Sequence, residues 1–203
     1  MNNNLILCDL EEVIFNISPK VIELLTYERY INEYTLDEIY NREHYDISEW
    51  LKIKEEDINT IYQKYSKDFY TNTKLNTITK GLQIGLDRDN FNLICFSYSN
   101  KYLDGYKKDF FDYIFNKKAR LNILEDKTTI GEYIKYNNLE NFKLYIGNTN
   151  SNIINVVEKF SEIKKEYRIP NFKFNHTNKI EKLLLEEYIK SSNSSLNYYQ
   201  PYY

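Results

Sequence analysis

The sequence predicts a three-layer α/β fold in which an open parallel sheet lies between helices. Short apolar runs at residues 4–8, 91–96 and 142–146 predict three buried strands. Continuous apolar runs of this length are typical of strands covered on both faces, as in parallel sheets. The segments between the runs have helical periodicity, and strands that alternate with helices favour parallel pairing with helices on both faces.

The helical segments have recognisable starts. Ser18 followed by Pro19 predicts one start, because serine caps helices well and proline fits the first helical position. Thr35 and Glu38 have the spacing of a capping box. Further helices are expected at about residues 58–69, 102–113, 128–136, 151–164 and 178–190, with a short strand between the second and third of these.

The domain organisation follows from the length of the first helical stretch. Residues 16–75 are too many for a single crossover and predict a helical insertion after the first strand. Residues 1–15 and 76–190 would form the α/β core, in which residues 168–174 make at best an edge strand because they include a proline. The polar, Tyr-rich residues 191–203 have no periodicity and predict a loop or a docking segment.

The composition argues against several classes of protein. Hydrophobic residues make up 42% of the 203 residues, enough to build a core, and the net charge of -3 does not indicate nucleic-acid binding. No apolar run reaches the roughly 18 residues that a membrane span needs, and residues 1–4 do not resemble a signal peptide. Cys8 and Cys95 lie inside apolar runs and are interpreted as buried thiols in a reducing compartment, which predicts a cytoplasmic protein.

The residue usage also carries a hypothesis about the source. Asn, Lys, Ile and Tyr, which have A/T-rich codons, are heavily used. This bias predicts an A/T-rich genome, such as that of a low-GC bacterium, its phage or a large DNA virus. A balanced codon composition in the source genome would contradict the hypothesis.

Polar residues follow the predicted strands at their carboxyl ends, where open parallel sheets bind ligands. They are Asp9 with Glu11, then Ser97, then Asn148 with Asn152, and Lys127 lies at the start of a helix between the second and third strands. An aspartate in this place can attack a phosphoryl group when a lysine and a hydroxyl hold the phosphate oxygens and Mg²⁺ neutralises charge. The pattern therefore predicts a phosphate-handling site centred on Asp9.

The order of these residues resembles the haloacid dehalogenase (HAD) superfamily over about residues 1–175. The motifs that carry the resemblance are Asp9 with Glu11, Ser97, Lys127, and Gly147-Asn148 with Asn152. The resemblance implies a Rossmann-like core. It also implies that the helical stretch after the first motif is a cap, which closes over the site and selects a small phosphorylated metabolite or nucleotide.

The resemblance also implies a role for each residue. Asp9 matches the nucleophile that forms an aspartyl-phosphate, and Glu11 falls where the family has its acid/base aspartate. Ser97 matches the phosphate-binding hydroxyl, and Lys127 matches the lysine that neutralises charge. The metal ligands for Mg²⁺ would be Asp9 and the two fourth-motif positions, 148 and 152.

Four departures from the family pattern put activity in question. Asn148 and Asn152 replace two carboxylates, so they are weak ligands for Mg²⁺, a hard cation that anionic oxygens hold. Glu11 is one methylene longer than aspartate, which displaces a proton donor by about 1 Å. Glu12 replaces a small residue and is expected to add bulk and charge where phosphate approaches.

Two function classes therefore remain open. The first is a phosphohydrolase of low activity that works through Asp9. The second is a catalytically inactive HAD-like module that contacts a protein partner through the cap or through residues 191–203. The retained Asp9, Ser97 and Lys127 favour the first class, and the departures favour the second.

Overall fold

The computed structural model describes residues 5–40, 42, 44, 46–125 and 128–147. Its sheet has four strands, all parallel, in the order β3-β2-β1-β4. The strands are β1 (Leu5–Asp9), β2 (Asn92–Tyr98), β3 (Arg120–Leu124) and β4 (Phe142–Ile146). The predicted α/β, Rossmann-like fold is therefore confirmed, and β3 is the short strand expected between two helices.

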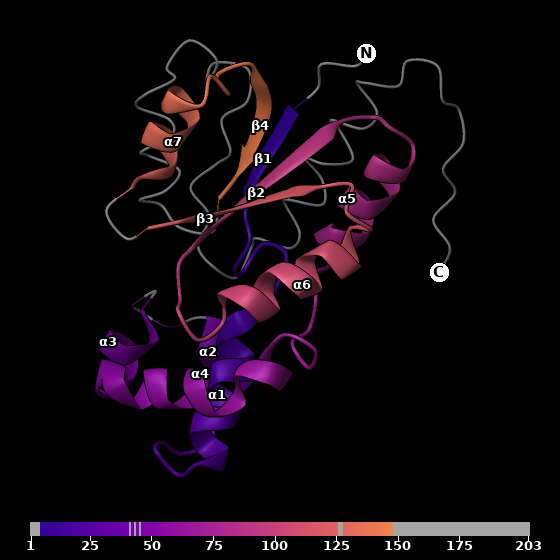
Figure 1. Ribbon diagram of the computed structural model, residues 1–203. Helices are drawn as coiled ribbons and strands as arrows, with labels where there is room; N and C mark the ends of the chain where they lie inside the picture. The colour runs from indigo at the N-terminus through magenta and orange to yellow at the C-terminus, as the bar shows by residue number, and fades with distance from the viewer. Residues whose placement is uncertain (1–4, 41, 43, 45, 126–127, 148–203) are drawn as a thin grey trace.

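Helices fill every connection between these strands. They are α1 (Ile17–Tyr27), α2 (Leu36–Tyr40), α3 (Ile47–Leu51), α4 (Glu55–Phe69) and α5 (Thr77–Asp87) between β1 and β2, α6 (Asp104–Ile114) before β3, and α7 (Ile130–Tyr136) before β4. Figure 1 shows α1–α4 gathered at the end of the sheet where β1 leads into α1. We call α1–α4 the helical segment. It therefore lies at the edge where parallel sheets bind ligands.

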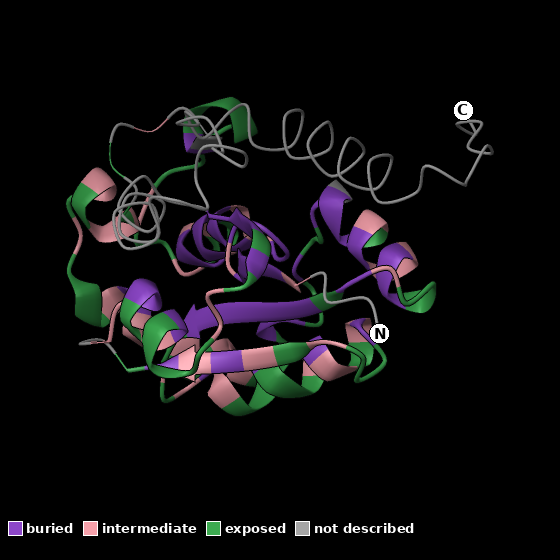
Figure 2. Cartoon of the chain, turned by 90° about the horizontal axis from the view of Figure 1, so that it is seen from above, coloured by how far each residue is buried: buried purple, intermediate pink, exposed green. Residues whose placement is uncertain are grey.

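The sheet is buried on both faces, because alternate residues of each strand point to opposite sides. Ile6 and Cys8 of β1 belong to an apolar cluster that includes side chains of α1, α4, α5 and α6. Leu7 of β1 and Phe96 of β2 belong to a second cluster, which includes side chains of α7. Figure 2 shows the strands largely buried, while the helices alternate between buried and exposed residues. The central strands thus hold their carboxyl ends rigidly in place.

The two cysteines are neighbours in the sheet. Cys8 and Cys95 pair in register between β1 and β2, and their Sγ atoms are 3.1 Å apart. Both are free thiols with no exposed surface. Their interpretation as buried thiols is therefore confirmed.

Helix starts are confirmed in one case and wrong in another. Thr35 and Glu38 form the predicted capping box: the Thr35 N–H donates to Oε2 of Glu38 at 2.7 Å, and the Glu38 N–H donates to Oγ1 of Thr35 at 3.3 Å. Ser18 is not a cap, because α1 already begins at Ile17. The Ser18 N–H and hydroxyl instead donate to the carboxylate of Glu12. The carboxylate of Glu12, six residues before Ser18, thus accepts the hydrogen bonds at the start of α1. Capping rules based on short sequence spacing do not predict such a contact.

Some predicted segments lie outside the described residues. They are the helices at 151–164 and 178–190, the edge strand at 168–174, and residues 191–203. Among the helices that are described, none is both long enough and apolar enough to cross a membrane.

Candidate functional site

Three of the predicted site residues meet at the carboxyl ends of β1 and β2. Asp9 ends β1 and pairs in register with Phe96, so Ser97 comes one position further along β2. Glu11 follows Asp9 by two residues, and its carboxylate accepts a hydrogen bond of 2.7 Å from the Ser97 hydroxyl. Asp9 and Ser97 are each only 3% exposed. Parallel pairing therefore brings the two strand ends together as predicted.

Asp9 is hydrogen-bonded to a tyrosine on the strand at its other side. The Tyr145 hydroxyl, from β4, donates to Oδ1 of Asp9 at 2.6 Å. Tyr145 pairs in register with Leu7, and Asp9 lies two residues further along β1, on the same face. Burial raises the pKa of Tyr145 well above its usual value, and the charge of Asp9 raises it further. Tyr145 therefore stays protonated and holds one oxygen of Asp9.

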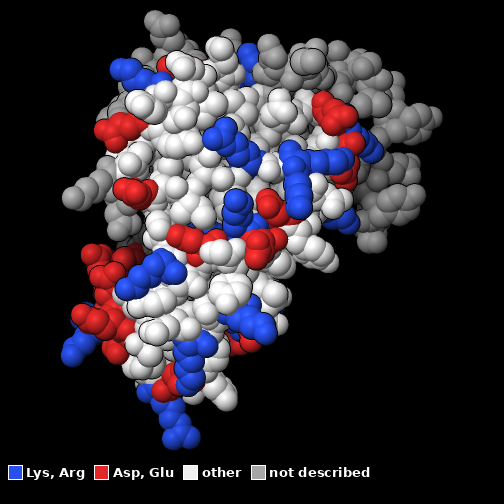
Figure 3. Space-filling model, viewed as in Figure 1, with Lys and Arg blue, Asp and Glu red and all other residues white. Residues whose placement is uncertain are grey.

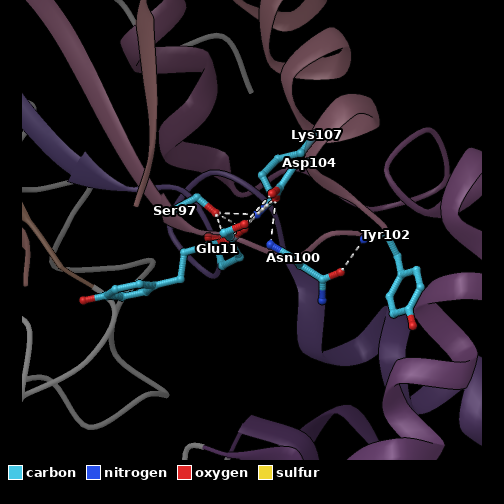
Figure 4. Close-up of polar contacts among 8 residues, drawn as sticks. Glu11, Ser97, Asn100, Tyr102, Asp104 and Lys107 are labelled. Carbon is cyan, nitrogen blue, oxygen red and sulfur yellow. Dashed lines mark hydrogen bonds and ion pairs between the residues drawn. The ribbon is translucent and has the colours of Figure 1, made fainter. Parts of the chain in front are cut away.

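Lys107 of α6 is the positive charge at the Ser97 side of the site. Its ammonium donates to Oγ of Ser97 at 2.6 Å and to the carbonyl oxygen of Tyr98 at 2.9 Å. It is also 3.2 Å from Oε1 of Glu11 and 3.4 Å from Oδ1 of Asp104. Figure 4 shows the four side chains converging. The Lys107 side chain is 2% exposed, while those of Glu11 and Asp104 are about a quarter exposed.

The charges around this ammonium do not balance. One lysine lies beside two carboxylates, so the group of Glu11, Asp104 and Lys107 has a net negative charge when all three are ionised. Figure 3 shows acidic and basic side chains interspersed over the visible face of the molecule, without a broad basic patch on that face. Among the described residues Lys107 is the buried cation of the site, and this side shows no wide positive field to draw in a dianion.

Two tyrosines of the helical segment lie near Glu11. Tyr70 follows α4 directly, and its phenol lies close enough to Glu11 for the charge of that carboxylate to act on it. Burial raises the pKa of Tyr70 well above its usual value, and the charge of Glu11 adds to the rise. Burial also raises the pKa of Tyr62, with further contributions from the charges of Glu11 and Glu12. Through α4, the helical segment therefore reaches the site.

Glu12 has a structural contact in place of the expected one with phosphate. Its backbone φ is 62°, in the left-handed region that favours glycine, which explains why a small residue suits this position. Its carboxylate accepts from Ser18, and Asn76 Nδ2 donates to its carbonyl oxygen at 2.6 Å. Burial raises the pKa of Glu12, while Ser18 and Arg42 act in the opposite direction. The charge of Glu12 thus lies at the start of α1.

The structure adds residues that sequence reasoning missed. Tyr145 and Lys107 make hydrogen bonds to predicted site residues, and Tyr70 lies near Glu11. Lys107 left a signal in the sequence, because it takes a core position of α6 between the buried Leu103 and Phe111, at spacing i, i+4, i+8. A lysine on the apolar face of a helix needs a buried partner, and this could have identified it.

Half of the predicted site residues lie outside the described part of the chain. These are Lys127, Asn148 and Asn152. Asp9 is the one candidate metal ligand among the described residues, in which no group of three or more His, Cys, Asp or Glu side chains could hold a metal. The described residues by themselves therefore supply no ligand set for Mg²⁺, and the ion remains a prediction of the resemblance.

Comparison with known proteins supports the fold. No protein-family model and no curated protein matches the chain. The fold is similar to the crystal structure of a predicted phosphatase from Clostridium acetobutylicum, with a TM-score of 0.52 and 15% sequence identity. The similarity covers 92% of this chain and 100% of the other. At this identity the likeness concerns the fold alone.

Proposed function

We propose that this chain is a HAD-like protein of the phosphatase type, which hydrolyses a small phosphate monoester or nucleotide slowly through Asp9. The observation that carries the proposal is that Asp9 ends β1 at the same sheet edge where Ser97, Glu11 and Lys107 contact one another. A nucleophilic carboxylate, a hydroxyl and a cation at one sheet edge are the groups that nucleophilic attack on phosphorus requires.

In the proposed reaction, a carboxylate oxygen of Asp9 attacks phosphorus and the ester P–O bond breaks. Glu11, which first leaves Lys107 and takes up a proton from water, gives this proton to the leaving oxygen, and Ser97 holds a phosphoryl oxygen. Water then attacks the aspartyl-phosphate, returns a proton to Glu11 and releases orthophosphate. Lys127 would add positive charge. When bound to Asp9, Asn148 and Asn152, Mg²⁺ would neutralise charge on the phosphoryl group.

Low activity follows from the contacts that Asp9 and Glu11 already make. The Tyr145 hydroxyl holds Oδ1 of Asp9, so this oxygen must lose a hydrogen bond before it attacks. Glu11 is bound to Ser97 and lies against Lys107, so it must leave before a phosphoryl group reaches either. Each charge-assisted hydrogen bond that has to break raises the barrier by about 1.5–3 kcal/mol.

We assign the helical segment the role of a substrate-selecting cap. It follows β1 directly, gathers at the carboxyl end of the sheet and reaches Glu11 through Tyr70. This placement favours a small substrate enclosed between α4 and the sheet edge. The proposed location is the cytoplasm.

A second candidate is an inactive HAD-like module that binds a protein partner through the helical segment or through residues 191–203. The observation that favours it is that Asp9 and Ser97 are both engaged by the chain's own side chains, Tyr145 and Glu11. In such a module these hydrogen bonds would stabilise the fold and have no part in turnover.

One assay separates the two candidates. The protein is incubated with Mg²⁺ and a panel of phosphate monoesters and nucleotides, with Asp9→Asn as the matched control. Slow release of phosphate above this control supports the hydrolase and contradicts the inactive module. If none is seen, the double variant Asn148→Asp with Asn152→Asp is assayed, and rescue would identify weak metal binding as the defect. Failure of both, with no Mg²⁺ binding by calorimetry, rejects the hydrolase.

A further inference from the structure

Two buried donor groups converge on the carboxylate of Glu11. The Ser97 hydroxyl donates to it at 2.7 Å, and the Lys107 ammonium lies 3.2 Å from the same oxygen. Ser97 belongs to β2 and Lys107 to α6, and each is at most 3% exposed. Tyr70 lies near Glu11: burial raises the pKa of Tyr70, and the charge of that carboxylate raises it further. A buried hydroxyl and a buried ammonium on one carboxylate form a built site for an oxyanion.

We propose that Glu11 is the resident anion of an oxyanion subsite formed by Ser97 and Lys107, and that this subsite takes a phosphoryl group or orthophosphate only when Glu11 leaves it. The choice of a phosphate ligand rests on the proposed function. The subsite itself rests on the contacts around Glu11. Lys107, a residue outside the sequence motifs, is the cation of the subsite.

The charge count makes Glu11 and phosphate competitors. Lys107 already lies beside two carboxylates, those of Glu11 and Asp104. A phosphate dianion placed on the same ammonium with both carboxylates still present would meet strong repulsion. The tether of Glu11 gives its carboxylate an effective concentration in the millimolar range or above, so free phosphate at lower concentration does not displace it.

The exposure of the groups indicates which of them moves. The side chain of Glu11 is 25% exposed and has a path to water, whereas that of Lys107 is 2% exposed. Lys107 is also held by the carbonyl oxygen of Tyr98 at 2.9 Å, which belongs to β2. The donors therefore stay in place when Glu11 swings out, and the vacated volume is lined by groups that bind phosphate oxygens.

Equilibrium binding of orthophosphate tests this without turnover. Calorimetry and ³¹P NMR are run on the wild type, Glu11→Ala, Glu11→Gln and Asp104→Asn. Asp104→Asn is the matched control, because it removes one negative charge beside Lys107 and leaves Glu11 in the subsite. We expect Glu11→Ala to bind phosphate roughly tenfold or more tightly than the wild type, with Glu11→Gln and Asp104→Asn between them.

Three outcomes would overturn the proposal. If the Glu11→Ala variant binds orthophosphate no more tightly than the wild type, Glu11 does not block the subsite. Equal gains in phosphate affinity in Glu11→Ala and Asp104→Asn show that the loss of one negative charge is sufficient, and that Glu11 does not occupy the subsite. Unchanged phosphate binding after Lys107→Met is added to Glu11→Ala shows that the lysine is not in the subsite. Near-UV circular dichroism checks folding, and the near-isosteric Glu11→Gln, expected to gain affinity, replaces Glu11→Ala if that variant does not fold.

The result is independent of the turnover assay. Phosphate binding that rises in Glu11→Ala supports the subsite even in a protein that hydrolyses nothing. Conversely, a protein that hydrolyses monoesters through Asp9, but whose Glu11→Ala variant gains no phosphate affinity, retains its proposed function and loses the subsite.

Discussion

The site has two halves, one around Asp9 and one around Ser97, and their polar groups are satisfied by different kinds of contact. Asp9 is buried between β1 and β4, where a neutral donor, Tyr145, satisfies one of its oxygens. Ser97 lies in a half that is built from charges, with Lys107 between the carboxylates of Glu11 and Asp104. The first half contains a short hydrogen bond from a neutral donor, and the second an ion network that is partly open to water.

This difference indicates which half of the site an incoming ligand can rearrange. A buried tyrosine–carboxylate hydrogen bond is screened little by salt, and no mobile ion competes for it at rest. An ion network whose carboxylates are a quarter exposed can rearrange when a new anion arrives. We therefore place the adjustable part of the site at Glu11 and the fixed part at Asp9.

The largest effect is expected from Lys107→Met, which removes the buried ammonium of the charged half. It leaves Glu11 and Asp104 without their shared ammonium, and we expect the free energy of unfolding to fall by about 2–3 kcal/mol, less than for a fully buried charge pair because both acids are partly exposed. Urea denaturation measures it. The exposed Lys108→Met is the matched control on the same helix, and an equal loss there would remove Lys107 from the network.

Tyr145→Phe tests the neutral half. Loss of the hydroxyl leaves Oδ1 of Asp9 without this donor, and we expect the free energy of unfolding to fall by about 1.5–2 kcal/mol. The same change frees the oxygen for attack, so phosphate release should rise relative to the wild type. Chemical denaturation and the monoester assay measure the two effects, with the exposed Tyr136→Phe as control. A stable variant without faster release would mean that Tyr145 does not restrain Asp9.

A smaller effect is expected from Ser97→Ala. The variant loses the hydroxyl between Glu11 and Lys107, but these two remain within 3.2 Å of each other and keep their attraction. We expect a loss of about 1 kcal/mol in the free energy of unfolding. Urea denaturation measures this loss. A fall in the free energy of unfolding as large as that of Lys107→Met would show that the charged half depends on the hydroxyl and not on the cation.

The smallest effect concerns the pH dependence at Glu12, which lies next to the site in sequence but contacts Ser18 of α1. Burial raises its pKa above the ordinary value of 4.5, so the folded chain keeps a proton that the unfolded chain has lost. The contribution of Glu12 to the free energy of unfolding is fully present below about pH 4.5, the ordinary pKa. It decreases as the pH rises through the raised pKa of the folded chain. Glu12→Gln should remove this decrease.

Unfolding free energies measured from pH 4 upwards test it. The difference between the wild type and Glu12→Gln should move in favour of the variant with rising pH, while the exposed Glu125→Gln should show no such trend. A difference that stays constant with pH would contradict the raised pKa of Glu12.

The sequence alone determined the strands and the meeting of Asp9 with Ser97. Continuous apolar runs mark buried strands, and parallel strands end at the same edge, so two strand-end residues had to become neighbours. The capping box at Thr35 was equally local and is confirmed. These features depend on spacing within an element or on the rule that adjacent parallel strands share a direction.

Only the tertiary structure decided what each site residue binds. Tyr145 and Asp9 are 136 residues apart, and Ser97 and Glu11 are 86 apart, so no periodicity connects them. Lys107 reads as a solvated lysine until α6 is packed on the sheet and its ammonium comes within 2.6 Å of Ser97. Hydrogen bonds of buried groups are set by the side chains that packing brings within about 3 Å, and a one-dimensional pattern does not contain that distance.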